Sequence, residues 1–155
     1  MNTSPTCERA YHVLDIANVL RNPFFQMDDV VHLHKVWDNC TQKGDTDQYF
    51  IATGPGTAAA LCFGWPIAQK QIRAGQDGAD YAIIEQLQDI DFIASRFDHV
   101  YLGTGDHIIC EAAKKLVEAG VRVTIVAPRM SIHSDFYRVK GLEFTYLDDQ
   151  WELVA

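Results

Sequence analysis

Short apolar runs alternate along the chain with longer stretches in which apolar residues recur at helical spacing. The runs predict five β-strands, at residues 11–15, 48–52, 99–102, 121–127 and 143–147. Strands that alternate with helices form βαβ units. This pattern therefore predicts a parallel sheet whose strands are joined by right-handed crossovers.

Apolar residues spaced three and four apart predict the helices between these strands. The second helix is interrupted near Gly64-Trp65-Pro66, because proline removes a backbone donor. A short helical turn is expected before the last strand. The predicted helices and this turn occupy residues 27–37, 58–74, 79–97, 108–117 and 131–139.

The predicted fold is α/β, a doubly wound, five-stranded parallel sheet of order 2-1-3-4-5 with helices on both faces. A chain of 155 residues fits one domain, which we place at residues 10–155 behind an N-terminal arm of residues 1–9. In such sheets, ligands bind beyond the carboxyl ends of the strands where the winding direction reverses. Here that point lies between the first and third predicted strands.

The chain has 13 basic and 21 acidic residues, and its net charge is −8. This balance disfavours tight, non-specific binding to nucleic acid, because phosphate contacts supply most of that affinity. The balance is compatible with a nucleic-acid enzyme if part of the acid surrounds bound cations. The chain has neither a bilayer-length apolar run nor a secretion signal at its start, so we expect a cytoplasmic protein with no membrane partner.

Two aspartates follow strands at the predicted switch point. Asp15 ends the first strand, Asp106 follows the third, and Asp80 lies near the first turn of a helix. Each of the first two has an ordinary alternative role as a helix cap. Carboxylates held at one edge repel each other unless a cation or a shared proton intervenes. We therefore expect all three to bind Mg²⁺ or Mn²⁺, which prefer oxygen ligands and can activate water for attack at phosphorus.

These aspartates lie in three short motifs, Asp15-Ile16-Ala17-Asn18, Gly78-Ala79-Asp80 and Thr104-Gly105-Asp106. Together, in this order, the motifs resemble those of NYN-domain proteins, the PIN-like nucleases, over most of the chain. The resemblance implies a PIN-like, Rossmann-like sheet. It also implies a metal-dependent endoribonuclease that cuts RNA with Asp15, Asp80 and Asp106 as metal ligands.

The resemblance extends to residues that would help to hold the substrate. Asn18 would orient a ligand or the loop itself, and Ser131 with an acidic residue such as Asp135 would complete the site. Arg21 and Arg129 lie on loops expected at the same edge and are candidates for binding substrate phosphate. His107 is a candidate general acid.

Two departures from the family pattern leave a rival hypothesis open. Many members carry a second acidic residue two positions after the one matching Asp106, where this chain has Ile108. The basic residue often found before the Gly-x-Asp motif is also missing, since Gln76 and Asp77 stand there. The rival is a binding module for a nucleotide, RNA or a protein partner, which would use the loop at 53–57 and the acidic edge. A homo-oligomer is also left open.

Overall fold

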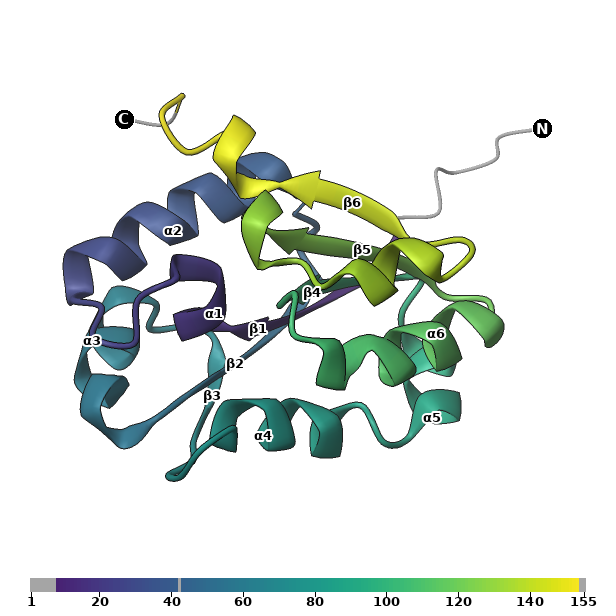
Figure 1. Cartoon of the computed structure of the whole chain (residues 1–155), viewed down its shortest axis with the longest axis horizontal. Coiled ribbons are helices and arrows are strands. Elements are labelled where there is room, and N and C mark those ends of the chain that lie inside the picture. The colour runs from purple at the N-terminus through teal and green to yellow at the C-terminus, as the bar shows by residue number, and fades with distance from the viewer. Residues whose placement is uncertain (1–7, 42, 154–155) are drawn as a thin grey trace.

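The computed structural model describes residues 8–41 and 43–153. At its centre is a six-stranded, all-parallel sheet in the order β3-β2-β1-β4-β5-β6 (Figure 1). Residues 1–7 of the predicted arm lie outside the described residues. The strands are β1 (Ala10–Asp15), β2 (Gln48–Thr53), β3 (Gln69–Ile72), β4 (His99–Gly103), β5 (Arg122–Ala127) and β6 (Glu143–Tyr146).

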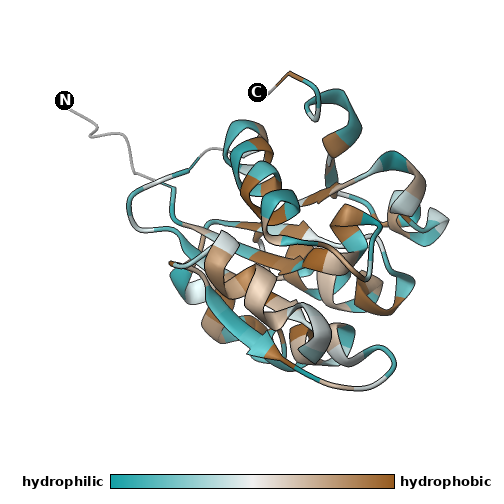
Figure 2. Ribbon diagram, turned by 90° about the vertical axis from the view of Figure 1, so that its left-hand side faces the viewer, coloured by the Kyte–Doolittle hydropathy of each residue, from teal (hydrophilic) through white to brown (hydrophobic). Residues whose placement is uncertain are grey.

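The sheet has one strand more than the sequence predicts, and the prediction of five strands was wrong. Residues 58–74 were predicted as one helix interrupted near Gly64-Trp65-Pro66. α3 (Ala58–Gly64) does end there, but the residues beyond it, Gln69–Ile72, form β3 on the free edge of β2. β3 is mostly polar, and Figure 2 shows the hydrophobic residues concentrated on the strands inside the sheet. A polar edge strand lacks the apolar run that reveals a buried strand, and hydrogen bonding to its neighbour defines it instead. The order of the five predicted strands is confirmed.

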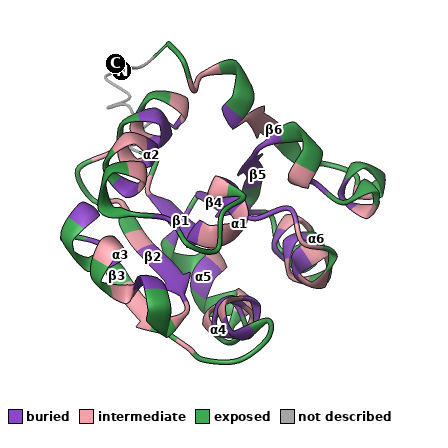
Figure 3. Cartoon of the chain, turned by 60° about the vertical axis from the view of Figure 1, so that its left-hand side comes forward, coloured by how far each residue is buried: buried purple, intermediate pink, exposed green. Residues whose placement is uncertain are grey.

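Helices cover both faces of the sheet. α2 (Met27–Cys40) and α3 lie on one face, while α4 (Gly78–Gln86), α5 (Ile90–Arg96) and α6 (Cys110–Glu118) lie on the other (Figures 1 and 3). Neighbouring residues of β1 show this arrangement. On one face, the amide of Gln86 on α4 donates to the Tyr11 hydroxyl at 2.7 Å. On the other face, the next residue, His12, accepts the indole N–H of Trp37 on α2.

The remaining helical segments are short. α1 (Ile16–Leu20) directly follows β1 and was not predicted. The helix predicted at 79–97 is divided into α4 and α5, because the Asp89 side chain accepts from the Phe92 N–H and begins a new helix. The 3₁₀ turns are η1 (Pro55–Thr57), η2 (His107–Ile109), η3 (Arg129–Ser131), η4 (Ser134–Arg138) and η5 (Leu147–Asp149).

A buried polar network holds the beginning of β1. The indole N–H of Trp37 can only donate, so Nδ1 of His12, 3.0 Å away, accepts. The proton of His12 is therefore on Nε2, which donates to Asp47 at 2.8 Å. Burial lowers the pKa of His12, with the Asp47 carboxylate acting against that shift. The neutral imidazole is thus a satisfied structural group of the core.

Among the described residues, no helix is long and apolar enough to cross a membrane.

The sheet and its helices leave the carboxyl ends of the strands at one edge of the molecule. The loops that follow β1, β4 and β5 meet at this edge, where α1 packs against β4 and β5. The fold therefore brings together the loops that carry the aspartates identified in the sequence.

Candidate functional site

The candidate site lies between β1 and β4, where the winding of the sheet reverses. On one side of this point the strands run β1, β2, β3 toward the edge of the sheet, and on the other side they run β4, β5, β6. Leu14 pairs with Gly103 in the register of these two strands, so Asp15 lies beside the start of the 104–106 loop. A ligand site at this position is what the topology favours.

Asp80 reaches the same edge from α4. Asp77 has a left-handed backbone (φ 58°), and Gly78 begins the helix where an added Cβ would lie 2.7 Å from the Arg73 carbonyl oxygen. Glycine therefore allows the chain leaving β3 to turn tightly into α4. Asp80 follows in the first turn, on the side of the helix that packs against β1 and β2.

Asp15 and Asp80 form a buried carboxyl pair, with exposed fractions of only 7% and 5%. Burial raises the pKa of both groups, and the pKa of Asp80 rises to about 7 with the charges of Asp15 and Asp106 adding to the effect. The Asp15 oxygens accept the backbone N–H groups of Asn18 and Ala17, which favours the ionised form of Asp15. Asp80 therefore keeps the proton and shares it with Asp15 in a hydrogen bond.

One oxygen of Asp80 is left without a partner. Its Oδ1 is buried and accepts no hydrogen bond within the described chain. A buried polar atom without a partner destabilises the folded state by about 1–3 kcal/mol. A buried atom of this kind calls for an explanation, such as a bound ion or water or a catalytic role.

Asp106 lies at the open side of this pair. Its side chain is 32% exposed, its Oδ1 accepts the Ile108 N–H at 3.1 Å, and Nδ1 of His107 lies 3.3 Å from the same oxygen. The Asp106 charge raises the pKa values of both buried aspartates, so the three carboxyl groups interact electrostatically.

Over residues 8–41 and 43–153, no group of three or more His, Cys, Asp or Glu residues is arranged to hold a metal ion.

Asn18 connects α1 to the loop that carries Asp106. Its side-chain Oδ1 accepts the backbone N–H of Gly105 at 3.2 Å. Of the two roles expected for Asn18, orienting a ligand or the loop, this contact serves the loop. It holds Asp106 in place relative to Asp15, which caps the same short helix.

Gly105 is needed because the chain after β5 passes directly over it. The Gly105 carbonyl accepts the His133 N–H at 2.8 Å, and an added Cβ would lie 2.6 Å from the Cα of Ile132. We expect Gly105→Ala to lower the free energy of unfolding by about 2 kcal/mol, because rigid backbone atoms would have to move. Gly54→Ala is the matched control, since no atom lies within 4 Å of its Cβ position. Urea unfolding that gives equal values for the two variants would contradict this role.

The candidate phosphate-binding arginines lie at the carboxyl edge but differ in their surroundings. Arg129 pairs with Asp149 at 3.3 Å, and its guanidinium lies 4.1 Å from the ring centroid of Tyr146. Arg21 is exposed at the end of α1 with a left-handed backbone (φ 53°), beside a hollow lined in part by Trp151. A role for either in phosphate binding stays a prediction.

His133, which the sequence did not indicate as a site residue, lines a shallow groove beside the carboxyl pair. The ring of His133 lies beside that of His107, tilted by 45° with 5.3 Å between the centroids, and its Nδ1 lies 3.5 Å from Asp135. In the sequence, the feature that could have indicated His133 is its position two residues after the candidate residue Ser131. The groove holds about 280 Å³ and is lined by Asn18, Gly105, Asp106, His107, Met130, Ser131, Ile132 and His133.

The loop at 53–57 closes on itself. The hydroxyls of Thr53 and Thr57 are 2.7 Å apart, and the Thr57 N–H donates to the Gly54 carbonyl at 3.4 Å. Its polar side chains therefore satisfy each other within a turn of η1. The binding role that the rival hypothesis gives to this loop stays a prediction.

No family model matches the chain, and no curated protein matches its sequence. Among solved structures, a protein of unknown function from Vibrio parahaemolyticus aligns over 96% of this chain and 98% of its own, with a TM-score of 0.70 and 15% identity. An FMN-dependent cysteine decarboxylase from thioviridamide biosynthesis aligns over 95% of both chains with a TM-score of 0.39 and 13% identity, too low to support an argument. The likeness to the Vibrio protein therefore establishes the α/β fold alone.

Proposed function

We propose that the chain is a metal-dependent endoribonuclease in which Asp15, Asp80 and Asp106 hold Mg²⁺ or Mn²⁺. The observation that supports this most is the buried pair formed by Asp15 and Asp80 at the switch point of the sheet. Two carboxyl groups removed from water repel each other once both are ionised, and only a proton or a cation relieves that repulsion. A fold that retains such a pair at its ligand-binding edge is suited to a cation.

The residues present fit a hard divalent ion. The donors are carboxylate oxygens, and Oδ1 of Asp80 is buried without a partner. Mg²⁺ keeps several waters and is usually bound by one or two carboxylates together with substrate phosphate. A pair of carboxylates with a third beside it therefore suffices, even though no three ligands among the described residues are grouped around one point.

Each residue has a defined part in this proposal. A bound divalent cation would supply a water of lowered pKa and offset charge on the phosphodiester. Asp15, whose ionised form is favoured by two backbone N–H groups, would attract the cation, and Asp80 would release its proton to solvent when the cation binds. Asp106 adds charge at the solvent side, beside the groove through which RNA would approach.

The acidic composition agrees with this arrangement. Part of the excess negative charge is concentrated at the three aspartates, and bound cations would reverse the local field there. RNA would then approach a site whose charge depends on the metal. We infer that cleavage, and part of RNA binding, require the ion.

A binding module without cleavage is the second candidate function. It is favoured by Ile108, which occupies the position where many NYN-domain nucleases carry a second acidic residue. Such a module would keep the fold and the acidic edge but turn over no RNA. The same assay separates the two candidates.

We expect wild-type protein to cut single-stranded RNA with Mn²⁺ and Asp106→Asn to lose this activity. The amide oxygen of this variant can still accept the Ile108 N–H, so the free energy of unfolding should change by about 1 kcal/mol or less. Asp89→Asn is the matched control, because Asp89 also caps a helix but lies at the start of α5. Wild-type protein that leaves RNA intact over a range of Mg²⁺ and Mn²⁺ concentrations would favour the binding module.

A further inference from the structure

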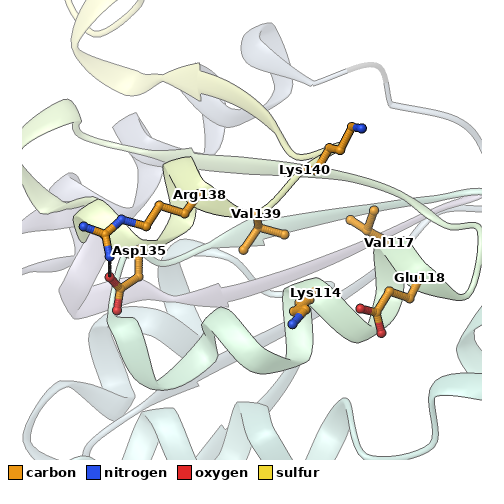
Figure 4. A pocket seen from close by; sticks show the side chains of 7 residues that line it. All are labelled: Lys114, Val117, Glu118, Asp135, Arg138, Val139 and Lys140. Carbon is orange, nitrogen blue, oxygen red and sulfur yellow. Dashed lines mark ion pairs between the residues drawn. The ribbon is translucent and has the colours of Figure 1, made fainter.

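A second, larger groove lies between α6 and the segment that leads from η4 into β6 (Figure 4). It encloses about 600 Å³. Gly141 brings its two walls together, because its backbone is left-handed (φ 94°) and an added Cβ would lie 2.9 Å from Cγ1 of Val117. The groove is lined by Lys114, Val117, Glu118, Asp135, Arg138, Val139 and Lys140.

Three cationic side chains surround this groove in a protein whose net charge is −8. Arg138 is 82% exposed and reaches Asp135 only at 3.7 Å. Within the described part of the chain, neither Lys114 nor Lys140 forms an ion pair. By contrast, Arg73 and Arg122 on other surfaces each lie 2.8 Å from a glutamate oxygen. Asp135 and Glu118 line the groove too, so its three cations exceed its carboxylates by one, and the two lysines supply the positive charge that no described carboxylate pairs with.

The arrangement of the side chains suits a chain of phosphates. Figure 4 shows Val117 and Val139 between Lys114 and Lys140, so an apolar strip separates two cationic positions. Glu118 also lines the groove, but its carboxylate points away from Val139 and Lys140. Single-stranded nucleic acid is bound in grooves whose positive charge follows the phosphate backbone.

One side-chain contact connects this groove to the candidate site. Asp135, which lines it, lies 3.5 Å from Nδ1 of His133. His133 in turn lines the shallow groove that contains Asp106 and His107. An extended strand with one phosphate at the aspartates would therefore lead past His133 and Asp135 toward Arg138 and the two lysines.

We propose that this groove binds the phosphate backbone of single-stranded RNA that extends from the aspartate edge. The inference rests on the proposed nuclease function, because RNA is its substrate. A duplex would present two charged backbones to an acidic protein and needs a broader cationic face. Single strands therefore match the size and charge of this groove better.

The test is fluorescence anisotropy with a labelled oligouridine in EDTA at low salt, so that binding is measured without metal and without cleavage. Lys114→Gln/Lys140→Gln should weaken binding about tenfold and lower the slope of log K against log salt by about 1.4, as expected for two lost contacts to a single strand. Lys35→Gln/Lys115→Gln is the matched control. It removes the same charge, with Lys35 on α2 and Lys115 turned toward a different hollow of α6.

The two double variants separate the groove from the overall charge. Weakening confined to Lys114→Gln/Lys140→Gln supports the groove, and equal weakening in both variants overturns it. An oligouridine that does not bind wild-type protein also overturns it, as does a duplex that binds more tightly than the single strand through these lysines.

Cleavage is measured separately in Mn²⁺. If the wild type binds oligouridine through Lys114 and Lys140 but cuts nothing, the groove stands and the nuclease function fails. If the wild type cuts RNA and Lys114→Gln/Lys140→Gln cuts it with unchanged KM, the nuclease function stands and the groove fails.

Discussion

Between about pH 5 and about pH 8, the metal-free protein is expected to lose on the order of 2 kcal/mol in its free energy of unfolding through the Asp15–Asp80 pair. The pKa of Asp80 in the folded protein is about 7, well above the ordinary value of 3.8. In this window the folded state therefore binds more protons than the unfolded state. The free energy of unfolding must then fall as the pH rises, and the loss is complete above the folded pKa.

Asp80→Asn should remove most of this pH dependence. The amide carries no charge at either pH, so the repulsion from Asp15 disappears, and at about pH 8 the variant should be more stable than wild type by a similar amount, about 2 kcal/mol. Asp45→Asn is the control, because Asp45 is an exposed carboxylate outside the site. Urea unfolding at several pH values in EDTA measures all three proteins. A wild-type curve parallel to that of Asp80→Asn would show that the pair does not share a proton.

Metal ions give this experiment a second readout. Millimolar Mg²⁺ or Mn²⁺ should raise the melting temperature of wild type most at high pH, where Asp80 gives up its proton easily. Asp80→Asn should respond much less. Na⁺ at matched ionic strength controls for screening, and equal shifts from Na⁺ and Mn²⁺ would argue against a site.

Asp15→Asn is expected to reduce Mn²⁺-dependent RNA cleavage about a thousandfold, which corresponds to roughly 4 kcal/mol of activation free energy. Backbone N–H groups favour the ionised form of Asp15, so its loss removes the charge that would attract the proposed cation. The amide oxygen can still accept the Asn18 N–H, which preserves the beginning of α1. Gel-resolved cleavage of single-stranded RNA, with circular dichroism to check folding, measures the effect.

Comparing single and double variants tests whether the aspartates act together. Asp15→Asn and Asp80→Asn combined should cut no more slowly than the worse single variant, because groups that hold one ion fail as a unit. Asp45→Asn should cut like wild type. A folded Asp15→Asn protein with full activity would exclude Asp15 as a metal ligand.

The strands inside the sheet could be predicted because burial on both faces requires continuous apolar runs. All six residues of β1 and all five of β4 are buried, so the neighbouring polar positions stand out. This is why the sequence placed Asp15 and Asp106 at one edge of the sheet. The alternation of strands and helices predicted a parallel sheet covered on both faces, since crossovers between parallel strands have one handedness.

The edge of the sheet and the interior of the site depend on contacts between distant residues. β3 is a strand because Gln69–Ile72 hydrogen-bonds to β2, although its own residues carry no strand pattern. The role of Asn18 depends on Gly105, and the place of His133 depends on the chain after β5 crossing that glycine. The two members of each pair are far apart in the sequence, so no local sequence pattern reveals the contact between them.

Protonation was also decided only by the tertiary structure. The sequence identified Asp15, Asp80 and Asp106 as carboxylates without distinguishing them, since their residue type is the same. Packing α4 against β1 removes Asp80 from water, while the backbone N–H groups of α1 stabilise the charge on Asp15. The sequence by itself thus determined which residues reach the edge of the sheet, because hydrophobic periodicity sets the elements. The tertiary structure decided which member of the buried pair holds a proton more readily, because desolvation and hydrogen bonding arise only when those elements pack together.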